Sequence, residues 1–301
     1  MIAHWDEVEQ HRRDFGHIKG EWQDLGLAAG SVSVGVRRIR LASGEIPTPQ
    51  HLHPVEEEIF FVLEGGGLSK QDDATYVVRA NDCLVHLAMG EAHTLRADAE
   101  GLVVLAFGHR MRTPGAYLPN AKRYWLLPTW TEVAQEPHPY EAEPELEWPE
   151  PSQRPPNIVN VDEVEPEQWG DRDMGGLERA LGASAGSVRT GLNHEVISPG
   201  KLNTAPHCHS AEEEIFVVLG GKGTLLLGDD EHPVRAGHVV SRPPGTRVAH
   251  AFRADDEELT LLSYGTREPN DITYYPRSRV VALRGVGVFG RIEPIDPGEV
   301  F

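Results

Sequence analysis

Two copies of one short stretch decide the fold: His51-Leu52-His53-Pro54-Val55-Glu56-Glu57-Glu58 and His207-Cys208-His209-Ser210-Ala211-Glu212-Glu213-Glu214. In each copy two histidines stand two residues apart, and the last glutamate follows five residues after the second histidine. A further histidine comes later in each half of the chain, His93 in the first and His250 in the second. Three imidazoles and one carboxylate, present twice, indicate two metal sites with mixed nitrogen and oxygen ligands.

The match between the two halves extends far beyond these ligands. At a constant offset, Ile2, Asp6, Leu25, Gly30 and Gly44 find Ile158, Asp162, Leu181, Gly186 and Gly200. A period this long indicates two copies of a domain, because the repeats of a solenoid run to only about 20–50 residues. We therefore predict an N-terminal domain at residues 1–127 and a C-terminal domain at residues 158–301. Residues 128–157 are rich in proline and glutamate, which is typical of an extended linker.

The segments around the motifs are short and β-rich, with turn residues between them. Strands are predicted at Ser31–Leu41, Glu58–Leu63, Thr75–Val78, Cys83–Leu87 and Leu102–Phe107, and turns at Gly44, Gly65–Gly67, Asn81–Asp82 and Gly90. Strands at this spacing are typical of an all-β sandwich or barrel. Only short helices are expected, near Asp6–Arg13 and Asp162–Trp169.

The spacing inside each motif fits a strand that is followed by a turn. Residues i and i+2 of a strand share a face, so His51 and His53 can both reach one ion. Glu58 stands an odd number of residues from His53, so the chain must turn between them, and Pro54 permits a turn. Glu58 then opens the next strand and His93 comes from another. Only a closed or strongly curved sheet brings all four side chains together.

Composition argues against several classes of function. The net charge of −19 opposes binding to nucleic acid and to anionic membranes. The sequence contains no run of about 20 apolar residues, so no transmembrane helix is predicted. The first residues lack the basic and apolar regions of a secretory signal. Cys83 and Cys208 lie at unrelated positions in the two halves. No disulfide is therefore implied, and a cytoplasmic location is the default expectation.

The donor set accepts a divalent transition metal, with iron or manganese favoured and nickel, cobalt or zinc as alternatives. Four protein ligands leave two positions of an octahedral ion open for substrate, water or O2. A structural zinc site is more often closed and rich in cysteine. The pattern therefore favours chemistry at the metal.

These motifs resemble those of the cupin superfamily, and their duplication resembles a bicupin with two tandem cupin_2-like domains. The first motif is carried by Gly44, His51, His53, Glu58 and Gly65, and again by Gly200, His207, His209, Glu214 and Gly221. The second motif is carried by Ala88–His93 and Pro243–His250. The resemblance covers nearly the whole chain and implies two jelly-roll barrels of the double-stranded β-helix type. It also implies one metal ion per barrel, held by His51, His53, Glu58 and His93 and by His207, His209, Glu214 and His250.

Three classes of function stay open on this basis. The leading hypothesis is a dioxygenase that acts on a small organic molecule with O2, in which Glu58 or Glu214 also accepts a proton. The second is redox-neutral isomerisation, decarboxylation or lyase chemistry on a sugar or a carboxylic acid. The third is binding of a small ligand without turnover. Uptake of O2 separates the first two classes.

Six further residues are candidates for a substrate pocket. Phe60, Val62, Phe216 and Val218 share strand parity with the ligand glutamates and are expected to face the barrel interiors. His86 and His109 lie in strands that are expected near the strand of His93, and a structural role is the alternative for both.

Two expectations concern residues outside these sets. The pairs Glu56-Glu57 and Glu212-Glu213 precede the ligand glutamates and are expected in solvated turns. Two copies of the chain can also pair as a homodimer, in which the N-terminal segment adds a strand to its partner.

Overall fold

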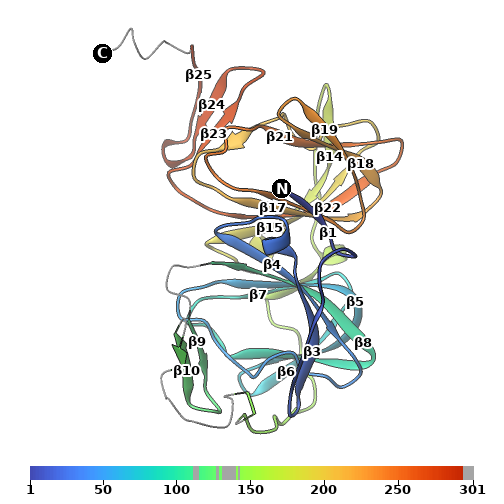
Figure 1. The fold of residues 1–301 in the computed structure, drawn as a ribbon, viewed down its shortest axis with the longest axis vertical. Helices are drawn as coiled ribbons and strands as arrows, with labels where there is room; N and C mark the ends of the chain where they lie inside the picture. The colour runs from blue at the N-terminus through green and yellow to red at the C-terminus, as the bar shows by residue number, and fades with distance from the viewer. Residues whose placement is uncertain (111–114, 127–128, 131–139, 142, 294–301) are drawn as a thin grey trace.

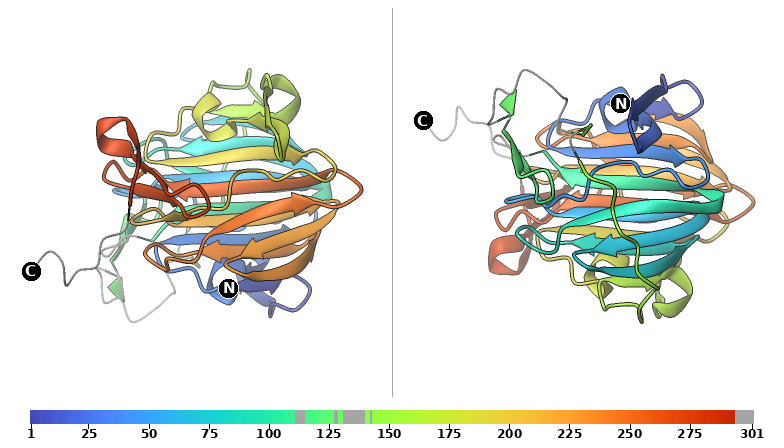
Figure 2. Two further views of the ribbon diagram at one scale, coloured as in Figure 1. Left: turned by 90° about the horizontal axis from the view of Figure 1, so that it is seen from above. Right: turned by 90° about the horizontal axis from the view of Figure 1, so that it is seen from below.

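Two antiparallel β-barrels, one from each half of the chain, are stacked along the long axis of the molecule (Figure 1). The computed structural model describes residues 1–110, 115–126, 129–130, 140–141 and 143–293. Viewed down the long axis, the two barrels overlap almost completely (Figure 2). The all-β class with a few short helices, predicted from the sequence, is confirmed.

The first barrel is built on a sheet with the strand order β12-β7-β5-β8-β4-β3-β2, and β6 pairs with β5 outside this order. The strands are β2 (His11–Phe15), β3 (Ile18–Asp24), β4 (Val34–Leu41), β5 (Glu58–Gln71), β6 (Ala74–Arg79), β7 (Asp82–His86), β8 (His93–His109) and β12 (Ile158–Asn160). The predicted strands fall on β4, β5, β6, β7 and β8, and β5 and β8 are much longer than predicted.

The pairing of β5 with β8 explains how distant ligands meet. The register runs from Glu58 opposite Gly108 to Gln71 opposite His93, so Glu58 and His93 lie at opposite ends of the paired strands. The register shifts between Val62 and Glu64 and again after Gly65, and such bulges bend a sheet. The bend wraps the paired strands β5 and β8 around the barrel, and this brings His93 close to Glu58.

The glycines at positions 65–67 do not form the predicted turn, and β5 continues through them. Gly65 has a φ of +75°, and a Cβ at this position would collide with the carbonyl oxygen of Gly101. Gly221 stands in the same situation in the second barrel, against the carbonyl of Glu258. Glycine is needed at this point because the backbones approach each other closely at the bend.

The second barrel repeats the arrangement. Its main sheet has the order β1-β20-β17-β22-β15-β14-β13, and a three-stranded sheet has the order β19-β18-β21. The strands are β1 (Ile2–His4), β13 (Glu167–Asp171), β14 (Met174–Arg179), β15 (Thr190–Ile197), β17 (Glu214–Gly220), β18 (Lys222–Leu227), β19 (Asp230–Arg235), β20 (His238–Arg242), β21 (His250–Ala254) and β22 (Leu259–Thr266).

Smaller elements flank the two barrels. One sheet combines β9 (Gly115–Leu118), β10 (Arg123–Leu126) and β11 (Thr129–Trp130), and another combines β16 (Cys208–His209), β23 (Ile272–Tyr275), β24 (Val280–Leu283) and β25 (Val288–Arg291). The helices are α1 (Leu25–Ala28) and α2 (Leu181–Ser184), with the 3-10 turns η1 (Val161–Glu163) and η2 (Arg284–Val286).

The predicted helices near Asp6–Arg13 and Asp162–Trp169 are wrong. In the first segment, β2 begins at His11 and pairs with β3, because pairing in a sheet overrides a weak local preference. In the second, only η1 forms before β13 begins at Glu167. Pro166 disfavours a helical conformation at the residue before it.

Each barrel receives one short strand from the opposite half of the chain. β1, at the N-terminus, pairs with β20 of the second barrel, where Ile2 lies opposite Val240. β12 pairs in the same way with β7 of the first barrel, where Ile158 lies opposite Leu84. One edge of β1 is therefore used within the chain, and pairing of two copies through this segment stays a prediction.

Strand alternation divides the apolar residues between three cores. Phe60 and Val62 of β5 point into the first barrel, whereas Ile59 and Phe61 point toward the second. The cluster between the barrels includes Leu192, Ile215, Val217 and Tyr264 from the second barrel, and the rings of Phe107 and Tyr264 lie 5.1 Å apart. The second barrel has its own interior core around Phe216 and Phe252. A shared apolar layer therefore joins the two barrels.

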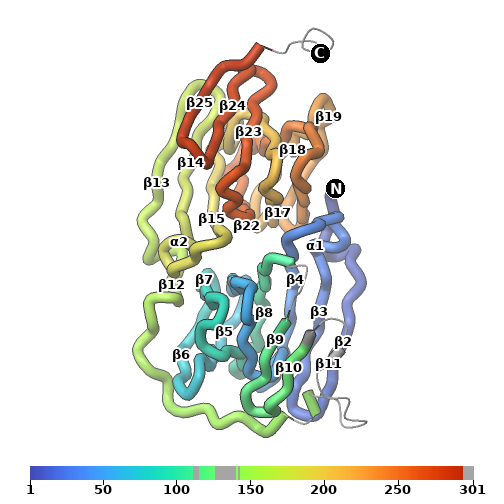
Figure 3. Tube along the Cα trace, turned by 90° about the vertical axis from the view of Figure 1, so that its left-hand side faces the viewer, coloured from blue at the N-terminus to red at the C-terminus, as the bar shows by residue number. Residues whose placement is uncertain are grey.

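The chain between the barrels follows the outside of the first one (Figure 3). The ring of Trp148 lies under the Arg96 guanidinium at 4.4 Å, and Ser152 donates its N–H to the carbonyl of Thr75 at 2.8 Å. Arg154 pairs with the buried Asp82 at 2.6 Å. Among the described residues, no helix has the length and apolar character needed to cross a membrane.

Candidate metal centres and their cavities

The four candidate ligands of the first barrel come from the ends of three segments. His51 and His53 precede β5, Glu58 is the first residue of β5, and His93 is the first residue of β8. The backbones of His51 and His93 hold each other, since each N–H donates to the other carbonyl, at 3.1 and 2.8 Å. Leu52 pairs in the same way with Tyr117 of β9. The histidine stretch is thus fixed from both sides.

The four side chains converge on one point. The Nε2 atoms of His51, His53 and His93 lie 3.7, 3.5 and 3.0 Å from Oε2 of Glu58. Ligand atoms bonded to one ion at about 2.1 Å and at right angles lie about 3.0 Å apart. The cluster is therefore arranged as the shell of a single metal ion.

The second barrel repeats this convergence. The Nε2 atoms of His207, His209 and His250 lie 3.8, 3.3 and 3.0 Å from Oε2 of Glu214. His209 ends β16, Glu214 opens β17 and His250 opens β21. The structure thus brings together all eight residues that the sequence pattern singled out as ligands.

Hydrogen bonds at the far side of the rings orient them. In the first barrel, Nδ1 of His51 lies 2.9 Å from the carbonyl of Pro49, and Nδ1 of His53 lies 3.1 Å from that of Gly115. In the second barrel, Nδ1 of His209 lies 2.7 Å from the carboxylate of Asp271. A proton held at Nδ1 leaves the Nε2 lone pair free for a metal.

The unsatisfied atoms of the second cluster fit a bound cation. Nε2 of His209, Nε2 of His250 and Oε2 of Glu214 are buried and have no hydrogen-bond partner among the described residues. Buried polar atoms are normally paired, so three orphans facing one point indicate a missing partner. Each barrel therefore has a His/Glu site for one divalent transition metal, as the sequence predicts.

The proton affinities show how strongly the clustered charges interact. Burial opposes the charged form of Glu58, but hydrogen bonds from the three imidazoles outweigh it and hold the pKa of Glu58 well below its usual range. Burial also opposes the charged His53 ring, and Glu58 nevertheless raises the pKa of His53 to about 9. Asp271 and Glu214 raise the pKa of His209 to about 10 against the same opposition. Each cluster therefore favours a positive charge between its imidazoles and its carboxylate.

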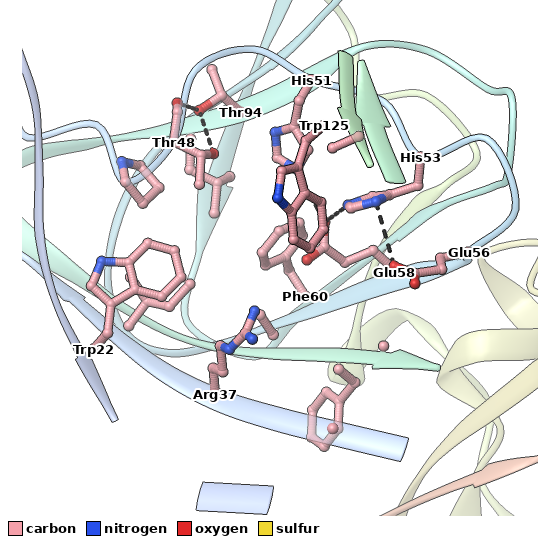
Figure 4. A pocket seen from close by; sticks show the side chains of 18 of the residues that line it. Trp22, Arg37, Thr48, His51, His53, Glu56, Glu58, Phe60, Thr94 and Trp125 are labelled. Atoms are coloured by element: carbon pink, nitrogen blue, oxygen red, sulfur yellow. Dashed lines mark hydrogen bonds and ion pairs between the residues drawn. The ribbon is translucent and has the colours of Figure 1, made fainter. Parts of the chain in front are cut away.

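The first cluster opens into a cavity of about 660 Å³ (Figure 4). Apolar and aromatic walls come from Trp22, Ile39, Phe60, Leu118 and Trp125, and the cationic side chains are Arg13, Arg37 and Arg110. Arg37 points from β4 toward the space beside Phe60 and Glu58 (Figure 4). The Arg13 guanidinium stacks over the Trp22 ring at 4.3 Å. The acidic residues Asp24, Glu56, Glu57 and Glu58 line it as well, so the cavity joins a metal site to side chains of both charges.

The second cluster opens into a smaller cavity of about 350 Å³. It is lined by the candidate ligands His207 and Glu214 and by Phe216, Trp169, Asn193, Asn203, Thr204, Ser263, Glu167, Glu178 and Glu195. No lysine or arginine is among the described residues that line it. Among the described residues, arginines therefore line the first cavity alone, whereas carboxylates line both.

The six predicted pocket residues fall into three groups. Phe60 and His109 line the first cavity, and Phe216 lines the second. Val62 and Val218 are fully buried in the barrel cores, beyond the cavities. His86 stacks on His93 with ring centroids 3.7 Å apart, and its Nδ1 lies 2.7 Å from the Glu91 carboxylate, so it supports the ligand from behind.

The glutamates beside the ligands are not in solvated turns as predicted. Glu57 is 2% exposed and Glu213 is fully buried, and each reaches into the opposite barrel. Glu213 accepts hydrogen bonds from the N–H groups of Val32 and Val34 and from the Ser241 hydroxyl, at 2.9, 3.1 and 3.0 Å. Charge runs usually mark solvated surface, and only the spatial contact of the two barrels reveals this role.

Comparisons with known proteins agree with this fold. The model of the Cupin domain family, Cupin_2, matches residues 37–107 and again residues 193–264. These two segments contain the candidate ligands His51, His53, Glu58, His93 and His207, His209, Glu214, His250. No curated protein sequence matches the chain.

Solved structures similar to the chain include oxalate decarboxylases. The formate complex of the Lactobacillus farciminis enzyme is 14% identical with a TM-score of 0.60, and the match covers 89% of this chain and 86% of that one. A Bacillus subtilis oxalate decarboxylase variant is 17% identical with a TM-score of 0.61, and the match covers 90% and 78% of the two chains. Another Bacillus subtilis structure, described with its Mn(II) centres, is 16% identical with a TM-score of 0.60 over 90% and 78%. The duplicated family match and the two-barrel fold show that the chain is a tandem cupin, a bicupin of the cupin superfamily.

Proposed function

We propose that the chain is a metal-dependent enzyme that cleaves a small carboxylic acid by redox-neutral chemistry, as a decarboxylase or lyase, in the cavity of the first barrel. The observation that carries this proposal is the position of Arg37 in the same cavity as Glu58. Manganese is the ion we favour, and the Mn(II) centres described for the Bacillus subtilis protein of like fold support this choice.

The first cavity is suited to an anion. Among the residues that the structure describes, the guanidinium of Arg37 has one weak ion pair, between its Nε and Asp24 at 3.5 Å, and its side chain is half exposed. Arg110 is held by the carbonyl of Ser31 and by Asp24, so it shapes the wall. A guanidinium presents parallel N–H donors that match a carboxylate. Arg37 is therefore placed to hold a substrate carboxylate beside the metal site.

Trp22, Phe60 and Trp125 surround this position with apolar surface. Such walls lower the local dielectric and strengthen the attraction between Arg37 and an anion. His51, His53, Glu58 and His93 would hold the metal, which supplies positive charge that stabilises the electron pair left when a carboxylate departs. In the overall reaction a C–C bond breaks, CO2 leaves, and a proton takes the electron pair at carbon, so no oxidant is needed.

We assign the proton transfer to Glu56 and the metal ligation to Glu58. Glu58, whose pKa is held low, is a poor proton donor. Glu56 lines the same cavity, and its Oε2 lies 3.5 Å from Nδ1 of His53, outside the cluster of Nε2 atoms. Its counterpart Glu212 accepts hydrogen bonds from Arg284 and from the N–H of Glu268. Because Glu56 shares a cavity with Arg37 and the first metal site, the proton carrier is proposed for the first barrel.

The dioxygenase hypothesis uses the same ligands and differs in its need for O2. The fold likeness to proteins named oxalate decarboxylases and the position of Arg37 in the first cavity support the redox-neutral alternative. Neither feature gives specific support for a site that activates O2. We therefore keep dioxygenation as the outcome that would replace the proposal.

The test is turnover of a panel of mono- and dicarboxylates by manganese-loaded protein, followed by CO2 release. Replacing Arg37 with Asn, the residue at the equivalent position of the second barrel, is expected to raise KM at least tenfold with metal content unchanged. Arg37→Lys should restore part of the loss. Glu56→Gln should lower kcat with little change in KM or in metal content. Unchanged KM in the Arg37 variants would contradict the proposal.

A further inference from the structure

We infer that the second barrel binds a different class of molecule from the first, an uncharged polyhydroxylated ligand held by Glu195, Asn193 and Asn203 beside the second metal site. This assignment goes beyond the proposed function, which concerns the first cavity. It follows from a comparison of equivalent positions in two cavities that have the same origin.

The residues at and beside the metal site are the same in both cavities, whereas other lining residues differ. Thr48, His51, Glu58 and Phe60 of the first cavity are matched by Thr204, His207, Glu214 and Phe216 of the second. The pairing of β4 with β8 and of β15 with β22 puts the changed positions in the same register, with Arg37 opposite Ala106 and Asn193 opposite Ser263. The walls can therefore be compared residue by residue.

Five of the six changes replace a cationic or apolar side chain with an amide, a hydroxyl or a carboxylate, and the sixth replaces Arg13 with Trp169. The first-cavity residues Arg13, Trp22, Arg37, Ile39, Pro47 and Ala106 are replaced by Trp169, Glu178, Asn193, Glu195, Asn203 and Ser263. Carboxylates line both cavities, but the second has no arginine among its described lining residues to attract a carboxylate ligand. The second cavity thus lacks the positive side chains that would favour a carboxylate in the first.

Glu195 is the central residue of the second wall. Its side chain is 7% exposed, and its two oxygens accept hydrogen bonds from the Ser263 hydroxyl and from the Asn203 amide, the latter at 3.2 Å. Asn203 is fixed in turn, because its Oδ1 accepts the N–H of Phe252 at 2.9 Å. Burial raises the pKa of Glu195 to about 7. A buried carboxyl locked in this way is preorganised to meet a ligand.

The mixture of groups favours hydroxyls over ammonium ions. Amides and hydroxyls both donate and accept hydrogen bonds, as ligand hydroxyls do, whereas an ammonium only donates. Trp169 adds one aromatic face to the lining, suited to the C–H side of a polyol. The unpartnered Nε2 of His250, a residue that is 98% buried, marks the metal end of the site. A volume of about 350 Å³ suits a small molecule.

The test uses full-length protein loaded with Mn(II), which speeds the NMR relaxation of ligand protons bound near it. The probes are xylitol, malonate and 1,4-diaminobutane. Two variants exchange the equivalent residues: Glu195→Ile, which copies the first cavity, and Arg37→Asn, which copies the second. Both are checked for two manganese ions per chain. Glu195→Gln, which keeps the volume of the side chain, serves if Glu195→Ile does not fold.

We expect the native protein to relax xylitol and malonate. Glu195→Ile should weaken the xylitol effect at least tenfold and leave malonate unchanged, and Glu195→Gln should weaken xylitol several-fold. Arg37→Asn should weaken the malonate effect at least tenfold and leave the xylitol effect unchanged. Loss of malonate alone from native protein would contradict the proposed function and leave this inference standing. Xylitol binding that survives both Glu195 variants, is absent, or is replaced by diaminobutane binding would overturn the inference.

Discussion

Thr190 of the second barrel donates both its backbone N–H, at 3.2 Å, and its hydroxyl to Oε1 of Glu57 in the first barrel. Glu213 makes the reciprocal contact with the turn before β4. Each of these buried carboxylates directly precedes a ligand glutamate, Glu58 or Glu214. The barrel interface and the two metal clusters are therefore parts of one hydrogen-bonded framework.

Replacing Glu57 with Ala is expected to destabilise the protein by about 3 kcal/mol, because buried N–H and hydroxyl donors lose their acceptor. Urea unfolding monitored by circular dichroism measures the change. The matched control is Glu100→Ala, which removes an exposed carboxylate from the same barrel. Equal stability of the two variants would show that the contact between Glu57 and Thr190 contributes nothing.

Metal content should respond to each barrel separately. We expect about two manganese ions per chain in the native protein and about one in either His51→Ala or His207→Ala, since each histidine belongs to one cluster. Elemental analysis after removal of loosely bound metal gives the stoichiometry. Loss of both ions from a single variant would mean that the sites are not independent, and two ions in either variant would remove that histidine from the ligand set.

The second site should depend on Asp271. This carboxylate orients His209 and increases its basicity, whereas the equivalent ring in the first barrel, His53, faces the carbonyl of Gly115. Asp271→Asn is expected to weaken manganese binding to one of the two sites by about 10–100-fold. Titration followed by electron paramagnetic resonance resolves the two affinities. The first site is the internal control, and equal weakening of both sites would contradict the assignment.

Glu195 should give the metal-free protein a specific dependence on pH. Its pKa is raised to about 7 in the folded state, so the stability it permits is fully present below its unfolded pKa of about 4.5 and is lost as pH rises through 7. Between pH 5 and pH 8, native protein should lose up to about 3 kcal/mol relative to Glu195→Gln. Parallel stability curves for the two proteins would show that Glu195 is ionised throughout.

The duplicated motif was enough to predict the fold class and to single out the eight clustered residues. Spacing alone placed His51 and His53 on one side and required a turn before Glu58, and the structure has this arrangement. The pattern carries this information because ligand geometry restricts both residue type and position.

Other features depend on contacts that no local pattern contains. The exchange of β1 and β12 between the barrels involves three-residue strands, too short for periodicity to be informative. The bend at Gly65 and the burial of Glu57 both depend on an approaching backbone from elsewhere in the chain. Alternation correctly turned Val62 inward, but it could not tell a cavity wall from the core behind it.

The loss of arginine from the second cavity could be recognised only once the structure identified the residues that line each cavity. Arg37 and Asn193 are equivalent in the repeat, yet nothing in the motif marks them as facing the metal clusters. A difference between equivalent residues of the two repeats can indicate a difference in ligand. It becomes informative only when the residues that line each cavity are known.

The central claim is redox-neutral cleavage of a small carboxylate in the first barrel. The most direct measurement records CO2 release and O2 consumption together while manganese-loaded protein acts on the carboxylate panel. We predict CO2 release with an O2 uptake below about a tenth of the CO2 released. At substrate concentrations below KM, this release should fall at least tenfold in Arg37→Asn and be retained in Glu195→Ile. Consumption of one O2 per turnover, or no turnover by protein that holds two metal ions, would contradict the claim.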